Sequence, residues 1–458
     1  MESIKVWEIA QALGLHSDST AEVTAICTDS REAGEGSLFV AIPGERVDGH
    51  DYVNRALAQG AAVALVEHTG DFPPERTLLV ENTVAAMGVL SAWYRRRFSL
   101  QVVGVTGSVG KTTTKDMIAA VLEAGFTTIK TQGNQNNQIG APRTLFSIDS
   151  ATQAAVVEMG MSGLGEIAAL ADAAQPQIGV ITNVGINHLE YLGTRENILR
   201  AKLELADALP DGAPLFLCSD NDLLQGVEIP RLHVVYYGID GGRAQLRGEI
   251  TQDTGHATHF TIHWQGKSWQ ASVPGTGRHL VQNALAAFGV GVTLGLEPQT
   301  AIRALQNYQP SGMRQHMVEK NGITIVEDCY NASPDSMAAA LRTLRDYPCT
   351  GRRMAVLSDM LELGSMEEEG HRATGRLAAQ AGLHSLWLWG RCAPLYQQGA
   401  VEAGMQNVHI YRQKAELAAD LAKELRPGDM VWFKASRGQK LEEAMERLYQ
   451  LLDSGNQS

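Results

Sequence analysis

The stretch Gly104-Val-Thr-Gly-Ser-Val-Gly-Lys-Thr-Thr-Thr-Lys115 decides the class of this fold. An apolar run, Val102 to Val105, leads into a glycine loop, and a helix-forming segment follows the loop. This order of strand, loop and helix is the context in which a backbone loop cradles phosphate groups. Converging N–H groups and the positive N-terminal end of the helix both attract phosphate oxygens. The stretch therefore predicts a site for a nucleoside triphosphate.

Each residue type in the glycine loop suits this chemistry. Gly107 and Gly110 let N–H groups turn towards phosphate oxygens. Lys111 is expected to reach the β- and γ-phosphates, and Thr112 to offer its hydroxyl to Mg²⁺. The spacing, Gly-x-x-Gly-Lys-Thr, is shorter than the standard loop. We expect the nucleotide to contact the whole run: Gly107, Ser108, Val109, Gly110, Lys111, Thr112 and Thr113.

Bulk properties limit the class of protein. A chain of 458 residues is too long for one core and predicts about three domains. A net charge of −13 argues against a nucleic-acid partner or an anionic membrane. Five cysteines lie far apart with no Cys-x-x-Cys pair, as in reduced cytosolic proteins, and no signal peptide or membrane span is recognisable. We expect a cytoplasmic monomer with small-molecule substrates, no nucleic-acid partner and no membrane insertion.

The order of elements predicts an α/β fold with three domains. Strands and helices alternate after the glycine loop, as in a mainly parallel sheet. From about Val234 to Val273 polar and apolar residues alternate, which predicts antiparallel strands at the sheet edge. A linker is expected near Tyr308 to Gly312, followed by a second strand–helix series typical of a doubly wound domain. The predicted domains are 1–83, 84–311 and 312–458.

The strands expected in these domains are short apolar runs. The first domain contains Ser37 to Ile42 and Ala61 to Val66. The central domain adds Ala154 to Glu158, Ile178 to Thr182 and Pro214 to Cys218. The last domain should contain Ile323 to Val326, Met354 to Leu357, Leu386 to Trp389, Val408 to Tyr411 and Met430 to Phe433. The tail from Asp453 to Ser458 is expected to be frayed.

Two polar side chains follow strands of the central domain. Glu158 closes one strand, and a carboxylate at the tip of a strand beside a phosphate loop is well placed to hold Mg²⁺. His188 follows the next strand, in a loop of the kind that carries functional sites. A solvated strand end and an ordinary polar loop residue are the alternative interpretations of these two positions.

Lys202 is unusual for its position on a helix expected from about Thr194. It shares a face with Ile198, Leu205 and Ala206, which should be buried. One interpretation is that its stem is buried and its ammonium extends to solvent. The other is that desolvation lowers its pKa and exposes a neutral amine, which could react with CO₂ to give a carbamate.

The ordered set of glycine loop, Glu158, His188 and Lys202 resembles the Mur ligase family, ATP-dependent amino-acid ligases of peptidoglycan synthesis. The resemblance runs nearly end to end. Its further motifs are Gly133-Asn-Gln-Asn-Asn-Gln-Ile-Gly140, Glu158-Met-Gly-Met-Ser-Gly-Leu-Gly-Glu-Ile167, Asp328-Cys-Tyr-Asn-Ala-Ser-Pro-Asp-Ser336 and Ser358-Asp-Met-Leu-Glu-Leu-Gly364. The last two resemble the members that join D-alanyl-D-alanine to a UDP-N-acetylmuramoyl-tripeptide.

The resemblance implies a small N-terminal UDP-binding unit, a central ATPase domain with a phosphate loop, and a Rossmann-like C-terminal domain. It implies ATP and two Mg²⁺ as cofactors, with Thr112, Glu158, His188 and a carbamylated Lys202 as metal ligands. Asn283 matches a residue near the adenine. Arg314 and Asp328 match groups that close over the γ-phosphate and the ribose. The implied catalytic residues are Lys111, His188, Lys202 and Arg314.

The implied contacts to the UDP-peptide and the dipeptide are spread over the three domains. They are Ser30, Arg31, Gly44, Asp48, Gly49 and His50 in the first domain, Asn136 and Asn137 in the second, and Asn331, Lys434, Ser436 and Arg437 in the third. Four positions depart from the family pattern: Leu280, Ser333, Ser358 and Ala435. Ala435 stands where the family usually has a glycine, which could adopt backbone angles that alanine resists.

The implied activity is amide formation through an acyl phosphate. One alternative is the ligase that adds a diamino acid to the UDP-dipeptide, although the Asp-Asn-Pro-Arg run of some such enzymes is absent. Folylpolyglutamate synthetase is more distant and would not need a uridine-binding domain. A switch or scaffold that binds ATP without ligation is the alternative from another class of protein.

Overall fold

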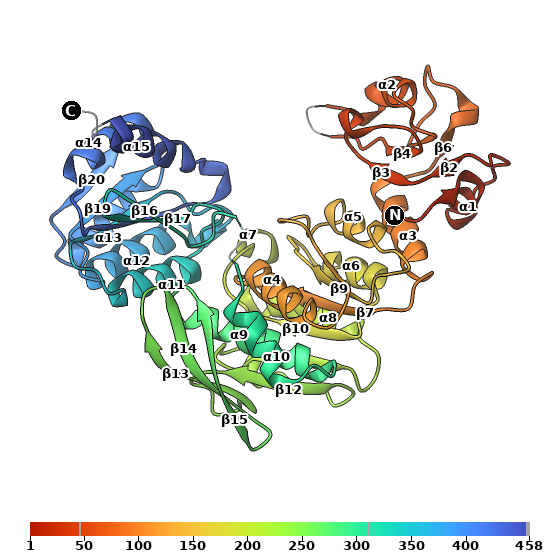
Figure 1. The fold of residues 1–458 in the computed structure, drawn as a ribbon. Coiled ribbons are helices and arrows are strands. Elements are labelled where there is room, and N and C mark those ends of the chain that lie inside the picture. Colours follow the sequence, from red (N-terminus) through yellow and green to blue (C-terminus); the bar gives the residue numbers. More distant parts are fainter. Residues whose placement is uncertain (45–46, 310–311, 455–458) are drawn as a thin grey trace.

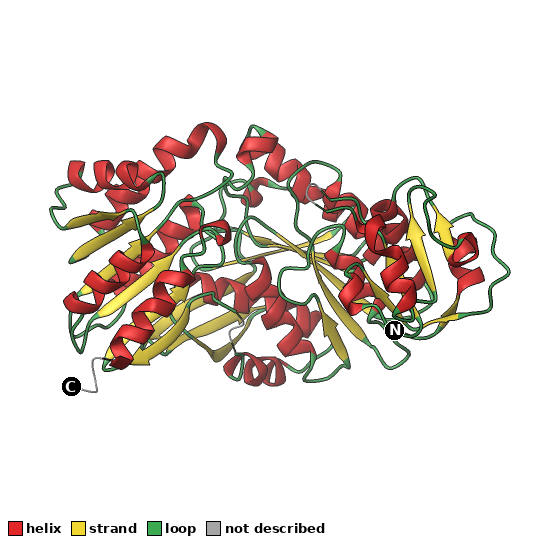
Figure 2. Ribbon diagram, turned by 90° about the horizontal axis from the view of Figure 1, so that it is seen from above, coloured by secondary structure: helices red, strands yellow, loops and turns green. Residues whose placement is uncertain are grey.

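The computed structural model describes residues 1–44, 47–309 and 312–454. Three larger sheets with their helices follow one another along the chain, after a two-stranded pair at its start, and the first and last of the three lie at opposite ends of the central one (Figures 1 and 2). The α/β class and the three-part organisation expected from the sequence are confirmed. In the described ranges, no helix combines the length and apolarity needed to cross a bilayer.

The N-terminal sheet is parallel and has the order β3-β4-β5-β6. Its strands and the helix α2 are β3 (Ala25–Cys27), β4 (Ser37–Val40), β5 (Val63–Val66), β6 (Thr77–Leu79) and α2 (Val53–Ala58). A short antiparallel pair precedes it: β1 (Ile4–Lys5) and β2 (Glu22–Val23), joined through α1 (Val6–Ala12). Helix α3 (Thr83–Arg95) leads out of this unit and packs against helices of the central sheet.

The central sheet has nine strands in the order β15-β14-β13-β12-β11-β10-β7-β9-β8. The strands are β7 (Gln101–Thr106), β8 (Thr128–Lys130), β9 (Ala154–Glu158), β10 (Ile178–Ile181), β11 (Pro214–Cys218), β12 (His233–Gly238), β13 (Leu246–Asp253), β14 (Ala257–Trp264) and β15 (Lys267–Pro274). Its helices are α4 (Lys111–Leu122), α5 (Gly140–Phe146), α6 (Glu166–Ala174), α7 (Leu189–Leu192), α8 (Arg195–Asp207), α9 (Arg278–Thr293) and α10 (Pro298–Gln306).

The antiparallel edge begins later than the sequence pattern indicates. Strand β12 pairs in parallel with β11, and only β13, β14 and β15 pair antiparallel to one another. The expectation of antiparallel strands from about Val234 is therefore wrong for the first of them. Residues 235–238 are all buried, which is typical of a strand inside a parallel sheet, whereas the alternation of buried and exposed residues starts at Leu246.

Strand β7 lies between β10 and β9, so the glycine loop that follows it stands at the carboxyl edge of the sheet, between the ends of these two strands. Val105 pairs with Glu158, and Thr106 pairs with Ile181. The polar residues that follow these three strands therefore meet at one edge, as ligand-binding residues do in open α/β sheets.

The C-terminal sheet has the order β16-β17-β21-β18-β19-β20. Its strands are β16 (His316–Lys320), β17 (Ile323–Asp328), β18 (Arg353–Leu357), β19 (Ser385–Trp389), β20 (Val408–Tyr411) and β21 (Met430–Lys434). Its helices are α11 (Pro334–Asp346), α12 (Glu367–Gln380), α13 (Ala393–Glu402), α14 (Lys414–Glu424) and α15 (Glu442–Ser454). Two separate apolar clusters cover its faces, one with α11, α12 and α13 and the other with α14 and α15, as in a doubly wound domain.

The strand predictions in this domain are confirmed, but β16, which pairs antiparallel with β17, was not expected. Pro310 and Ser311 of the predicted linker lie outside the described residues. The predicted frayed tail does so from Gly455 onwards, while Asp453 and Ser454 still belong to α15.

Candidate functional site

A cavity of about 440 Å³ lies between the central and C-terminal domains. Both domains contribute residues that the sequence singled out, and the cavity brings together side chains more than 300 positions apart in the chain. The central domain supplies Ser108, Val109, Gly110, Lys111, Thr112, Thr113, Asn136, Asn137, Glu158, His188 and Asn283, and the C-terminal domain supplies Arg314, Asp328, Asn331 and Lys434.

The glycine loop is held by the segment that follows β10. Gly107 has a φ of +151°, and a Cβ built there would overlap Oγ1 of Thr182. Gly110 has a φ of +81° and starts α4. Oδ1 of Asn183 accepts hydrogen bonds from the backbone N–H groups of Ser108 and Val109, each at 2.9 Å. Position 107 therefore requires glycine, because a larger residue would lack space there and would resist the backbone conformation.

The Lys111 side chain lies over its own loop. Its ammonium donates to the carbonyl oxygen of Gly107 at 2.7 Å. Burial lowers the pKa of Lys111, the Glu158 carboxylate raises it, and the Arg314 guanidinium lowers it further. Two cations from different domains thus approach the place where the loop would hold phosphate groups.

Glu158 is buried at the end of β9. Its Oε1 accepts hydrogen bonds from Oγ1 of Thr112 at 3.0 Å and from Nδ2 of Asn136 at 2.7 Å. Its Oε2 is also buried and has no hydrogen-bond partner in the described residues, although Nζ of Lys115 lies 3.8 Å away. A buried carboxylate oxygen without a partner, beside a hydroxyl and an amide, fits the oxygen ligands that Mg²⁺ prefers.

Lys115 is a residue of this site that the sequence reasoning missed. It is buried, and its ammonium donates to the carbonyl oxygens of Thr131 at 2.8 Å and Gly133 at 3.3 Å. It thereby ties α4 to the loop that carries Asn136. Its spacing of four residues after Lys111, one helical turn along the same buried stretch, was the available signal.

His188 lies in the left-handed region, with a φ of +62°, just before α7. Its Nδ1 is 2.7 Å from Oε2 of Glu362, which lies in the motif Ser358 to Gly364 of the C-terminal domain but was given no role from the sequence. In the described part of the chain, groups of three metal-ligating side chains with ligand atoms within 4.8 Å are Asp48, His50 and His68, and Asp359, His371 and Cys392. Glu158 and His188 line one cavity without forming such a group.

Lys202 is buried on α8, whose first turn is capped by Thr194. The interpretation that its ammonium extends to solvent is wrong, since only 1% of the residue is exposed. Burial lowers its pKa well below the usual value, and the positive charge of Lys111 lowers it further. Across the described residues, no hydrogen bond or ion pair to its ammonium is seen. Its side chain does not line the cavity, but it lies near enough to Lys111 for the two charges to interact.

On the C-terminal wall of the cavity, the ammonium of Lys434 makes two close polar contacts. Its Nζ lies 2.7 Å from Oδ2 of Asp328 and donates to the carbonyl oxygen of Asn331 at 3.1 Å. The guanidinium of Arg314 stacks over the ring of Tyr330, 3.8 Å from its centroid. On the central side, Oδ1 of Asn283 accepts a hydrogen bond from Oγ1 of Thr114 at 3.0 Å, so this amide is fixed against α4.

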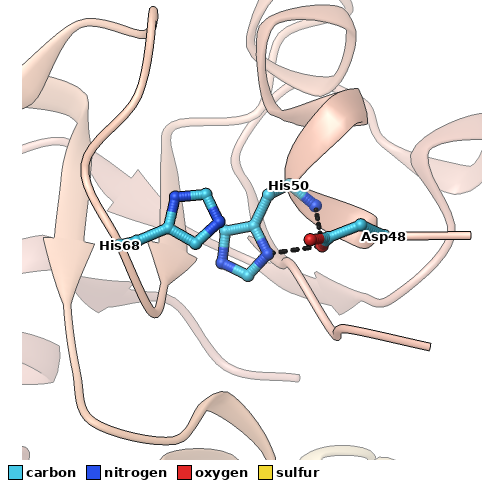
Figure 3. Close-up of side chains that lie close together, drawn as sticks. All are labelled: Asp48, His50 and His68. Carbon is cyan, nitrogen blue, oxygen red and sulfur yellow. Dashed lines mark hydrogen bonds and ion pairs between the residues drawn. The ribbon is translucent and has the colours of Figure 1, made fainter. Parts of the chain in front are cut away.

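The residues predicted to bind UDP are not in this cavity, because they lie in the N-terminal domain. Ser30 and Arg31 follow β3, and Gly44, Asp48, Gly49 and His50 follow β4. In Figure 3, His50 lies between Asp48 and His68. Nδ1 of His50 is 2.6 Å from Asp48, and its Nε2 accepts the backbone N–H of Glu67 at 2.8 Å. Both ring nitrogens of His50 are therefore engaged by the protein, which leaves neither of them free to bind a metal ion in this arrangement.

Two further predicted contacts lie beside the cavity without lining it. Oγ of Ser436 accepts the backbone N–H of Leu361 at 3.1 Å, and Arg437 forms an ion pair with Glu442 at 2.6 Å. Ala435 is buried and does not have a positive φ, so alanine is compatible with the backbone there.

The other departures from the family pattern have local roles. Ser333 caps α11, and Leu280 lines the cavity. Ser358 is fully buried, and its Oγ lies 3.5 Å from Oε1 of Gln439. None of these three side chains disturbs the contacts of the cavity described above.

Three family models match the chain in sequence. They are the Mur ligase family, catalytic domain, at residues 22–96, the Mur ligase middle domain at residues 105–291, and the Mur ligase, glutamate ligase domain, at residues 313–437. The chain is 37% identical to the UDP-N-acetylmuramoyl-tripeptide--D-alanyl-D-alanine ligase of Bacillus subtilis (strain 168), over 93% of both chains.

Solved structures agree with the sequence comparison. A crystal structure of MurF from Acinetobacter baumannii superimposes with a TM-score of 0.90 at 29% identity, over 98% of this chain and 99% of that one. MurF ligase from Thermotoga maritima in complex with ADP gives a TM-score of 0.83 at 30% identity, over 94% of this chain and 98% of that one.

Proposed function

The chain belongs to the Mur ligase family, and we propose that it is the ATP-dependent ligase that joins D-alanyl-D-alanine to UDP-N-acetylmuramoyl-tripeptide in peptidoglycan precursor synthesis. Relatives that carry the name of this ligase are 32–37% identical and match most of the chain. The observation that carries the proposal is the cavity in which a phosphate loop and Glu158 face Arg314 and the Asp328–Lys434 pair across a domain boundary.

ATP is the proposed nucleotide, and the Thermotoga maritima relative contains ADP. The run from Gly107 to Thr113 would hold its phosphates, with Lys111 on the β- and γ-phosphates. Asn283 would lie near the adenine and Asp328 near the ribose. Arg314, stacked on Tyr330, would approach the γ-phosphate from the C-terminal domain.

The residues on the central side fit two Mg²⁺ ions. Thr112 and Glu158 would hold one and His188 the other, with Lys202 as a carbamylated ligand of the second. The neutral amine of Lys202 would attack CO₂, forming an N–C bond and losing one proton, which leaves a carbamate anion. When bound by these residues, Mg²⁺ would neutralise negative charge on the γ-phosphate and help to orient the carboxylate of the peptide.

The proposed reaction has two steps. The terminal carboxylate of the tripeptide attacks the γ-phosphorus, and ADP leaves with the electrons of the broken P–O bond. The amine of D-alanyl-D-alanine then attacks the acyl carbon, loses a proton and displaces inorganic phosphate. Lys111 and Arg314 would stabilise charge on the transferred group, and the two domain walls would exclude water. Holding the two reacting groups in line can lower the activation free energy by about 7–11 kcal/mol in favourable cases.

The UDP end of the substrate is proposed to bind the N-terminal domain at Ser30, Arg31, Gly44, Asp48, Gly49 and His50. The peptide and the dipeptide would contact Asn136, Asn137, Asn331, Lys434, Ser436 and Arg437. The domain limits 1–83, 84–311 and 312–458, a cytoplasmic location and a monomeric state complete the proposal.

The test is phosphate release from ATP and Mg²⁺ with UDP-N-acetylmuramoyl-tripeptide present and D-alanyl-D-alanine added or withheld. Release that requires both substrates, with a product heavier by one condensed dipeptide, supports the ligase. Release with the UDP-dipeptide and a free diamino acid instead would assign the preceding ligase. Binding of ATP without release under any of these conditions would assign a switch or scaffold.

A further inference from the structure

The C-terminal domain contacts the loop that follows β10 at two points and the helix α7 at a third. Oε2 of Glu362 lies 2.7 Å from Nδ1 of His188. The carboxylate of Asp335, at the start of α11, accepts the backbone N–H of Ile186, and a Cβ built on Gly185 would overlap it. These contacts join residues 185–188 of the central domain to the C-terminal domain.

A third contact extends this junction to α7. A Cβ built on Gly364, which has a φ of +53°, would stand 2.9 Å from Cα of Glu190. The segment that carries Glu362 therefore packs backbone to backbone against the helix that His188 begins. Close packing on both sides leaves the Glu362 and His188 side chains little freedom to separate while the domains stay together.

Both partners of the His188–Glu362 contact have unusual backbone conformations. Each has a φ of +62°, in the left-handed region that non-glycine residues rarely adopt. Such a conformation is unfavourable for a non-glycine residue and persists where the surrounding structure enforces it, often at functional sites. Because both residues are strained and meet across a domain boundary, we infer that their contact has a functional role.

The geometry determines which ring nitrogen of His188 is free. Nδ1 of His188 is buried and makes an ion-pair contact of 2.7 Å with Oε2 of Glu362, but no hydrogen bond of standard geometry in the described residues; a carboxylate in this position can only accept a hydrogen bond. The proton of the neutral ring therefore belongs on Nδ1, and the lone pair on Nε2. A carboxylate on one nitrogen of a histidine fixes its tautomer and orientation and makes the other nitrogen a better ligand.

We propose that Glu362 is a positioning residue that reaches from the C-terminal domain to hold the proton of His188 on Nδ1, so that Nε2 faces the cavity as a ligand only while the domains are together. The role in metal binding rests on the proposed function, whereas the effect on the tautomer does not. The contact would make the binding site on His188 depend on the position of the domain that carries Arg314 and Asp328.

The test uses the full chain, with Glu362→Ala, Glu362→Gln and a control, Glu190→Ala. Glu190 lies at the same domain junction, carries the same charge and has no part in the proposed site. The first readout is the ¹⁵N–¹H spectrum of the histidine rings in ligand-free protein at about pH 8.5, two units above the usual histidine pKa. The His188 signals are assigned from their loss in His188→Gln.

The wild-type ring should carry its proton on Nδ1. Glu362→Ala should shift the population towards Nε2–H, and Glu362→Gln should keep the Nδ1–H form, because the amide oxygen still accepts. The second readout is the Mg²⁺ concentration for half-maximal phosphate release, expected to rise about 10- to 100-fold in Glu362→Ala and less in Glu362→Gln. Glu190→Ala should leave both readouts unchanged.

An unchanged tautomer in Glu362→Ala, or equal effects in Glu190→Ala, would overturn the inference. The two proposals fail separately. If the tautomer of His188 changes in Glu362→Ala but the wild type has no ligase activity, the positioning role stands and the proposed function is refuted. If the wild type is an active ligase but the tautomer does not change in Glu362→Ala, the function stands and the positioning role is refuted.

Discussion

Nζ of Lys434 lies 2.7 Å from Oδ2 of Asp328, and the two residues are direct neighbours at the ends of parallel strands β21 and β17. Both are buried, and the indole N–H of Trp432 donates a further hydrogen bond to the same carboxylate oxygen at 3.3 Å. In a buried pair each charge compensates the other, so removal of one partner leaves an isolated charge with a high desolvation cost.

Lys434→Met should therefore lower the free energy of unfolding by about 3–5 kcal/mol. The double variant Lys434→Met with Asp328→Leu should recover much of this loss, because no charge is left buried alone. Urea denaturation followed by tryptophan fluorescence measures both. Lys423→Met is the control: it breaks the exposed ion pair with Asp420 and should change stability by less than about 1 kcal/mol. Equal losses in Lys434→Met and Lys423→Met would contradict this account.

Gly107→Ala should abolish nucleotide binding and destabilise the central domain. The added Cβ would overlap Oγ1 of Thr182, and alanine resists the φ of +151°. Gly88→Ala is the matched control, because it lies in α3 with nothing within 4 Å of the added Cβ. It should raise stability by about 0.5–1 kcal/mol. Thermal unfolding and ADP titration distinguish the two; normal ADP affinity in Gly107→Ala would show that the loop tolerates a side chain.

Lys202→Met should stabilise the protein and eliminate phosphate release. Burial lowers the pKa of Lys202 in the folded state, whereas the unfolded state keeps the usual value of about 10.4. The unfolded state therefore binds more protons between these values, so the wild type loses stability as the pH falls from about 10 towards the lowered pKa. The methionine variant lacks this loss and should be more stable at pH 7 by about 1–3 kcal/mol.

The difference between Lys202→Met and the wild type should shrink as the pH rises towards 10. Urea denaturation at several pH values, in buffer free of CO₂ to keep the amine unmodified, measures it. A constant difference would mean that packing, and not the amine, accounts for the change. In buffer with ¹³C-bicarbonate, the wild type alone should give a ¹³C carbamate signal.

Local sequence predicted the elements of this site well, because the signals are short-range. The apolar run ending in Glu158 and the face of α8 that carries Lys202 are properties of a few neighbouring residues. Strand β16 was missed because its His-Met-Val-Glu-Lys pattern is half polar and is defined by pairing with β17. Glu362 lies in the quoted motif Ser358 to Gly364, but its contact with His188 was missed because the two residues are 174 positions apart and belong to different domains, so no pattern near either residue indicates the contact.

Glu158→Gln tests the metal site directly, because this substitution keeps the shape of the side chain. The amide oxygen can still accept from Thr112 and Asn136, which now bond Oε1. The NH₂ group would then replace Oε2, which is buried without a hydrogen-bond partner in the described residues. A donor in that position cannot bind a cation, so the fold should persist while Mg²⁺ binding fails.

Calorimetric titration of ADP with and without Mg²⁺ separates these effects. In the wild type Mg²⁺ should raise ADP affinity, and in Glu158→Gln it should not, while the affinity without Mg²⁺ stays similar. Phosphate release should fall at least about 100-fold, as expected for loss of a group that stabilises charge in the transition state. Glu166→Gln is the control, since Glu166 lines the same cavity but accepts the backbone N–H of Ser162. If Mg²⁺ still raises ADP affinity in Glu158→Gln, the ion binds elsewhere, because the substitution replaces the one carboxylate oxygen proposed to hold it.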